Sequence, residues 1–81
     1  MESIVHPTRR HIIKCLDRNE LSFSELLKCV PIGDNHGKLG YHLRKLVSLN
    51  IVYQGTLKKH HLTERGRIVS KLIRDLNQLN I

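Results

Sequence analysis

The sequence predicts a mainly α-helical domain with one small β-hairpin between its third and fourth helices. Apolar residues recur at helical spacing in four segments, most of which start with a capping or proline signal. The segment after Asn50 instead combines β-branched and aromatic residues with a turn signal. With 81 residues, the chain has room for one modest core, so we expect residues 1–81 to form a single domain.

Local signals place the first two helices. The first is expected from Pro7 to about Asp17, because proline is tolerated at the first helical position. The second is expected to start at Ser22, which has the spacing of a capping box with Glu25. Pro31 then stops this helix.

The third helix is expected to begin at an N-cap, either Asp34 or Asn35, and to end before a left-handed Asn50. A core-facing stripe at helical spacing comprises Leu39, Leu43, Leu46 and Val47. The opposite face comprises Lys38, Tyr41, Lys45 and Ser48, with Gly37 and Arg44 at its edge. This outward face is basic and carries no acid.

A strand over 51–54, a turn at Gly55-Thr56 and a basic return over 57–62 are expected to form the hairpin. Thr63 can cap a final helix over 64–81. Its apolar stripe comprises Ile68, Val69, Leu72, Ile73, Leu76 and Leu79. This stripe either packs on its own domain or forms a dimer seam. We favour the seam, made by Ile68, Leu72, Leu76 and Leu79, because so small a core cannot easily use the whole length.

The charge balance indicates a polyanionic partner. Fourteen Lys and Arg residues oppose seven Asp and Glu residues, which gives a net charge of +7. Nucleic acid and an acidic membrane face both fit this balance. Between Asp34 and Glu64 there is no acidic residue, so the positive charge is concentrated on the third helix and the hairpin. No apolar run reaches the length of a membrane-spanning helix, and we expect a cytoplasmic protein.

Two cysteines, Cys15 and Cys29, are too few and too isolated to suggest a disulfide framework, and we expect both to be thiols in a reducing compartment. His11 and Cys15 share one helical face, but two ligands do not make a metal site. No metal or cofactor is expected.

Two short helices joined by a tight turn, the second with a basic outward face, form a helix-turn-helix arrangement that places its second helix in the major groove of DNA. The expected DNA-contacting residues are Gly37, Lys38, Tyr41, Arg44, Lys45, Lys58, Lys59 and His60. Gly37 would allow close approach to the phosphates. No catalytic constellation stands at a recognisable spacing, so an enzyme is not expected. The alternative is a protein-interaction module whose basic face only confers solubility.

The successive motifs HPTRRHIIKCL, LSFSELLKCV, NHGKLGYHLRKLVSLNIV and HLTERGR cover nearly the whole chain. In this order they resemble the ArsR/MarR-type winged helix-turn-helix transcriptional regulators, especially their short archaeal-style members. The resemblance implies an α-α-α-β-β-α fold, dimerisation through the terminal helices and binding to a pseudo-palindromic operator. The cysteine-bearing metal motif of ArsR-type sensors is not reproduced, so a metal response is not implied.

Overall fold

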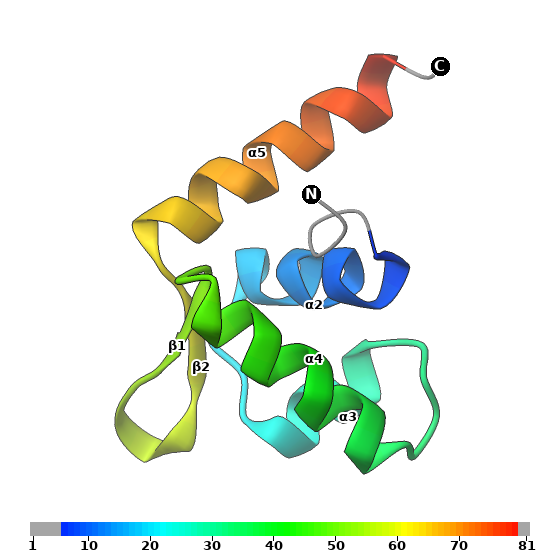
Figure 1. Cartoon of the computed structure of the whole chain (residues 1–81), viewed down its shortest axis with the longest axis vertical. Helices are drawn as coiled ribbons and strands as arrows, with labels where there is room; N and C mark the ends of the chain where they lie inside the picture. Colours follow the sequence, from blue (N-terminus) through cyan, green and yellow to red (C-terminus); the bar gives the residue numbers. More distant parts are fainter. Residues whose placement is uncertain (1–5, 80–81) are drawn as a thin grey trace.

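The computed structural model describes residues 6–79, except for the side chain of Leu79. Its elements are α2 (Pro7–Arg18), α3 (Phe23–Cys29), α4 (His36–Ser48), β1 (Val52–Gln54), the 3-10 turn η1 (Thr56–Lys58), β2 (His60–Leu62) and α5 (Glu64–Leu79) (Figure 1). The predicted fold class is confirmed: among residues 6–79, three helices precede an antiparallel hairpin, and a fourth helix follows it.

Side-chain caps start the helices where the sequence predicts them. The Ser22 hydroxyl accepts a hydrogen bond from the N–H of Glu25, and the Glu25 carboxylate accepts one from the N–H of Ser22, which completes the capping box. Asn35, rather than Asp34, caps α4 by accepting from the N–H of Lys38 at 3.0 Å. Each such cap stabilises its helix by about 1 kcal/mol.

Helix α4 ends in the left-handed residue predicted at Asn50, whose φ is 59°. The N–H of Asn50 donates to the carbonyl of Val47, and the N–H of Ile51 donates to the carbonyl of Leu46. This pair of bonds is the Schellman motif, and its usual apolar contact is available because Leu46 and Ile51 are both buried. The chain therefore leaves α4 directly into the hairpin.

Helix α2 lies at the centre of the molecule and packs against α3, α4, α5 and β2 (Figure 1). The buried apolar side chains are Ile12, Ile13, Leu16, Leu26, Val30, Leu39, Leu43, Leu46, Ile51, Val52, Leu62, Val69 and Ile73. The expectation that Val47 belongs to this core is wrong, because its exposed fraction is 47%. His42 occupies the buried face of α4 instead, and Val47 lies roughly a quarter turn from the centre of that face.

The hairpin differs from the sequence prediction at its tip. Strands β1 and β2 pair antiparallel with Tyr53 opposite His61, but the turn lies at Thr56–Lys58 instead of Gly55-Thr56. Gly55 does not form the turn; it leaves room for the neighbouring His61 ring, because a Cβ at this position would lie 2.9 Å from the Nε2 atom of that ring. The positive φ that closes the hairpin falls on Leu57 and Lys58, two residue types that give no turn signal in a sequence.

Helix α5 starts directly against the carbonyl groups that follow α4. The hydroxyl of Thr63 accepts from the N–H of Gly66 at 2.9 Å and donates to the carbonyl of Asn50 at 2.6 Å. A Cβ on Gly66 would collide with the carbonyl oxygen of Ile51, so this close approach requires glycine. Thr63 is therefore the predicted cap and also the link between the helix and the hairpin.

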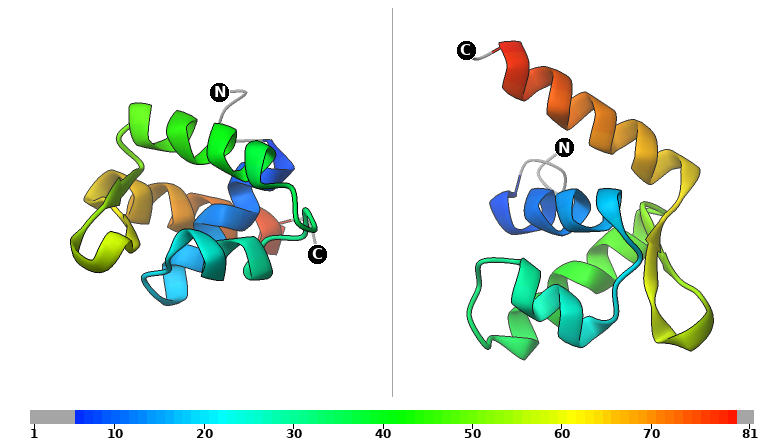
Figure 2. Two further views of the ribbon diagram at one scale, coloured as in Figure 1. Left: turned by 90° about the horizontal axis from the view of Figure 1, so that it is seen from below. Right: turned by 180° about the vertical axis from the view of Figure 1, so that it is seen from behind.

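The two faces of α5 have different surroundings. Val69 and Ile73 are buried against the domain, whereas Ile68, Leu72 and Leu76 are each more than half exposed. The last turns of α5 extend beyond the other helices (Figures 1 and 2). The side chain of Leu79, the remaining member of the expected seam, lies outside the described residues. The domain thus uses only one side of the apolar stripe.

The expectation of two free thiols is wrong, because Cys15 of α2 and Cys29 of α3 form a disulfide. Their Cα atoms are 6.4 Å apart, within the range that a disulfide spans. Leu26 and Val30 of the α3 segment are buried in the core that α2 lines, and this packing brings the two cysteines together. The disulfide links α2 to α3 at a sequence separation of 14 residues.

Reduction of this disulfide is expected to lower the free energy of unfolding by about 3 kcal/mol, because closing a loop of about 15 residues restricts the unfolded chain by that amount. Thermal unfolding with and without a reductant measures the effect, which corresponds to more than about 10 °C in a domain of this size. The Cys15→Ser/Cys29→Ser double variant is the control and should not respond to the reductant. Two titratable thiols in the oxidised, unfolded protein would contradict the pairing.

Candidate nucleic-acid interface

Helix α4 presents the basic face that the sequence predicts. Leu39, His42, Leu43 and Leu46 hold its inner side in the core. The predicted contact residues on its outer side are exposed: Gly37, Lys38, Tyr41, Arg44 and Lys45. The described part of this helix contains no acidic side chain, so its outer face has an uncompensated positive charge.

The two glycines of α4 have different surroundings. Among residues 6–79, a Cβ on Gly37 would have only the Asn35 side-chain oxygen within 4 Å, at 3.8 Å, so no packing contact with this part of the chain requires glycine there. A Cβ on Gly40 would lie 4.0 Å from the ring of Phe23 in α3. Gly40 therefore borders the neighbouring helix, while Gly37 leaves the first turn of α4 open to a close external surface.

The hairpin tip presents Leu57 and Lys58, both exposed. Lys59 is instead half-buried, and its ammonium forms a 3.3 Å ion pair with the Glu25 carboxylate. Among the expected DNA-contacting residues, His60 needs correction, because its exposed fraction is 8% and its Nδ1 lies 3.2 Å from the carbonyl of Leu21. The His60 side chain therefore presents little surface to a ligand.

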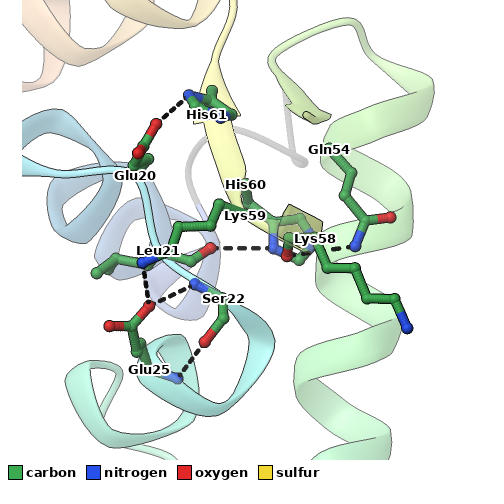
Figure 3. A network of polar contacts seen from close by, with 9 residues as sticks. All are labelled: Glu20, Leu21, Ser22, Glu25, Gln54, Lys58, Lys59, His60 and His61. Atoms are coloured by element: carbon green, nitrogen blue, oxygen red, sulfur yellow. Dashed lines mark hydrogen bonds and ion pairs between the residues drawn. The ribbon is translucent and has the colours of Figure 1, made fainter. Parts of the chain in front are cut away.

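Polar contacts attach the hairpin to the segment before α3 (Figure 3). Backbone hydrogen bonds join Leu21 and His60 in both directions, at 2.7 and 3.2 Å, so Leu21 adds a single bridge beside β2. His61 lies 3.2 Å from the Glu20 carboxylate. The pKa of Glu25 is lowered, first by the backbone N–H of Ser22 and then by the ammonium of Lys59. Sequence reasoning predicted the Ser22–Glu25 contact but missed the contacts of the hairpin with Leu21, Glu20 and Glu25, since these join residues far apart in the chain.

A second cluster lies where α2 meets α4, and sequence reasoning missed two of its members, Arg9 and His42. Arg9 has an exposed fraction of 7%, and its Nε–H donates to Nδ1 of His42 at 2.9 Å. The Arg9 guanidinium carbon is 5.9 Å from the centre of the Tyr41 ring, and the Lys45 nitrogen is 5.8 Å from it. The His6 ring lies 4.4 Å from that of His42. The cluster thus connects the core to the outer face of α4.

The pKa of His42 is lowered, mainly because burial disfavours its charged form, and further because His6, Arg9 and Lys38 are nearby cations or potential cations. Its Nδ1 accepts the hydrogen bond from Arg9, which requires that this nitrogen carry no proton. The neutral imidazole is therefore the form that the native contacts select.

We expect the stability of the domain to decrease as the pH falls below about 6.5, the ordinary pKa of histidine. Because the pKa of His42 is lower in the folded state, the unfolded chain takes up a proton first. The contribution of neutral His42 is complete above about pH 6.5 and is lost as the pH falls through the folded-state pKa. Urea unfolding of the native protein and of His42→Gln across this range measures it. The other histidines are common to both proteins, so a difference in stability that is independent of pH would contradict the prediction.

The geometry defines a class of protein, the winged helix-turn-helix domain: α3 and α4 form the helix pair, and the hairpin forms the wing. Residues 4–53 match the family model described as a helix-turn-helix domain, and the chain belongs to this family. No curated protein sequence matches the chain.

Two solved structures are similar to this chain. The MarR family transcriptional regulator from Silicibacter pomeroyi has a TM-score of 0.75 and 18% identity, over 91% of this chain and 53% of that one, so this chain spans about half its length. The transcriptional repressor BigR from Xylella fastidiosa has a TM-score of 0.72 and 26% identity, over 96% of this chain and 76% of that one. The expected resemblance to winged helix-turn-helix transcriptional regulators is confirmed.

None of the helices in residues 6–79 has the length and the apolar character that a membrane span requires. In the same part of the chain, no group of three or more His, Cys, Asp and Glu side chains is placed to hold a metal ion.

Proposed function

We propose that the protein is a sequence-specific transcriptional regulator that binds double-stranded DNA as a homodimer. The observation that carries this proposal is the exposed face of α4, which is basic along its length and has the wing next to it. Its membership of the helix-turn-helix domain family supports the same conclusion. We also propose that this regulator works in the cytoplasm.

In the proposed complex, α4 enters the major groove. Lys38, Tyr41 and Lys45 face base edges or flanking phosphates, and Gly37 permits close approach of the first turn. Arg44, at the edge of this face, holds a phosphate. Lys58 is the main phosphate contact of the wing, since Lys59 is already paired with Glu25.

The dimer would form through α5. Ile68, Leu72 and Leu76 are exposed on one side of this helix, and the described part of the domain leaves each of these apolar side chains more than half uncovered. Residues 1–81 would then be one DNA-binding domain in which 64–81 is the dimerisation helix, with Leu79 extending the seam. Two-fold symmetry of such a dimer would require a pseudo-palindromic operator with half-sites about one or more DNA turns apart.

The test combines light scattering with selection of bound sequences from a randomised duplex library. The proposal requires a dimer in solution and enrichment of an inverted repeat. Lys38→Gln/Lys45→Gln should abolish the enrichment, whereas Lys71→Gln, on the exposed side of α5, should preserve it. Uniform binding of all duplexes would reject sequence specificity, and a monomer that ignores DNA would reject the whole proposal.

A second candidate is a protein-interaction module, and the exposed apolar side of α5 is the observation that favours it. In that case α5 would bind a different protein, and the basic face would confer only solubility. A monomer that is indifferent to DNA and co-purifies with a partner through Ile68 and Leu72 would support this candidate. A dimer that selects an inverted repeat would exclude it.

A further inference from the structure

Arg9 is an unusual residue for the interior of so small a domain. It lies in the first turn of α2, on the side facing α4, and is more than nine-tenths buried. No carboxylate among residues 6–79 lies within ion-pair distance of its guanidinium. Within this part of the chain, the orientation of Arg9 is therefore set by an imidazole and an aromatic ring.

The imidazole fixes one edge of the guanidinium. The hydrogen bond from Nε of Arg9 to Nδ1 of His42 is 2.9 Å long and buried. His42 is itself held in the core by its position between Leu39 and Leu43 on the inner face of α4 and by the adjacent ring of His6. The guanidinium is planar, so fixing one edge orients the whole group.

The oriented guanidinium faces Tyr41, which is about half exposed on the outer side of α4. Its central carbon lies 5.9 Å from the centre of the Tyr41 ring, and the ammonium of Lys45 lies 5.8 Å from the same point. Both distances are within the range of cation–π attraction. The edge of the Tyr41 ring also meets the His42 ring at 5.2 Å, with a T-shaped geometry. Tyr41 is thus held on several sides before any ligand is present.

We infer that Arg9 is a positioning residue for DNA recognition: from the α2–α4 junction it holds the Tyr41 ring in one orientation, and Tyr41 makes the specific contact. The inference rests on the proposed function. An exposed tyrosine otherwise loses rotamer freedom when it binds, and a ring already held in place avoids that loss. Arg9 thus improves discrimination between sequences without contacting DNA.

A double-mutant cycle on the full chain tests this inference. Affinity is measured for the selected duplex and for a scrambled duplex of the same length, with Arg9→Gln, Tyr41→Ala and the double variant. Arg18→Gln is the matched control, because it removes the same charge from the exposed far end of α2. Arg9→Lys keeps the charge but lacks the planar group.

We expect Arg9→Gln to weaken binding to the selected duplex about tenfold and to the scrambled duplex by less than about twofold. In the Tyr41→Ala background, Arg9→Gln should weaken binding to the selected duplex by less than about twofold, since the ring through which Arg9 acts is absent. Arg9→Lys should restore part of the discrimination. Arg18→Gln should weaken both duplexes equally.

Two results would overturn the inference. If the effects of Arg9→Gln and Tyr41→Ala are additive and the slope of log affinity against log salt falls by about two per dimer, then Arg9 contacts a phosphate directly in each protomer. If Arg9→Gln weakens both duplexes equally and in proportion to a lower unfolding temperature, then its role is only structural.

A measurement without DNA separates this inference from the proposed function. The chain has two tyrosines, so Tyr53→Phe leaves Tyr41 as the only one. In that background, nuclear magnetic resonance should show contacts between the Tyr41 ring and the Arg9 side chain, and Arg9→Gln should shift the ring resonances while Arg18→Gln leaves them unchanged. Unchanged resonances in Arg9→Gln would reject the positioning role, whether or not the protein selects a duplex.

Discussion

Raising the salt concentration from about 50 to about 200 mM is expected to weaken the binding of the protein to its duplex by about 10³- to 10⁵-fold, if the dimer neutralises roughly six to ten phosphates. Each protomer offers exposed cations for this purpose, namely Lys38, Arg44, Lys45 and Lys58. Every phosphate that such a cation neutralises releases a condensed counterion, and the entropy of that release decreases as the salt concentration rises.

Titrations of one labelled duplex at several salt concentrations measure the effect as the slope of log affinity against log salt. Lys58→Gln should reduce this slope by about two per dimer, because each wing would lose one phosphate contact. Lys59→Gln should reduce it less, since the ammonium of Lys59 is already paired with Glu25. An affinity that does not depend on salt would contradict the proposed mode of DNA binding.

The Ile68→Glu/Leu72→Glu variant is expected to be a folded monomer that binds the operator about 10²- to 10⁴-fold more weakly. Both side chains are exposed in the protomer, so their replacement leaves the core intact. Two charges on each side of an apolar seam would repel one another across it. The loss in affinity is the avidity that a dimer gains by engaging two half-sites at once.

Mass by light scattering, helix content by circular dichroism and operator titration would be measured on the same samples. Lys71→Glu is the matched control, because it also lowers the net charge by two and lies on an exposed part of α5. That variant should remain a dimer. If Ile68→Glu/Leu72→Glu stays dimeric, the seam lies on another surface of the molecule.

The sequence predicts best what depends on neighbours along the chain. The capping box of Ser22 and Glu25, the left-handed Asn50 and the cap at Thr63 are all present, because each is set by interactions within a few residues. For α5, helical periodicity predicts an apolar stripe, but it does not show which side of the stripe is buried and which is exposed. Which half of that stripe the domain covers depends on the size and placement of α2.

What the sequence could not predict depends on contacts between elements. His42 takes the place expected of Val47 in the buried face of α4, where it bonds to Arg9, and a pattern of apolar residues does not point to a buried histidine. The disulfide depends on how α3 packs against α2. On the wing, the sequence gives Lys58 and His60 the same expected role as basic residues. In the structure His60 is buried beside Leu21, with which it forms a bridge, whereas Lys58 is exposed.

The attachment of the wing to the segment before α3 has a consequence for the speed of recognition. Because contacts from Glu20, Leu21 and Glu25 attach β2 and the adjacent Lys59 to α3 and the segment before it, we expect the wing to keep one position relative to the helix pair. No loop has to close around the duplex after the first encounter, so a protein oriented correctly by its charge can complete the complex in a single step. Association near the electrostatically steered limit would follow, and differences between operators would then appear in how long the complex lasts.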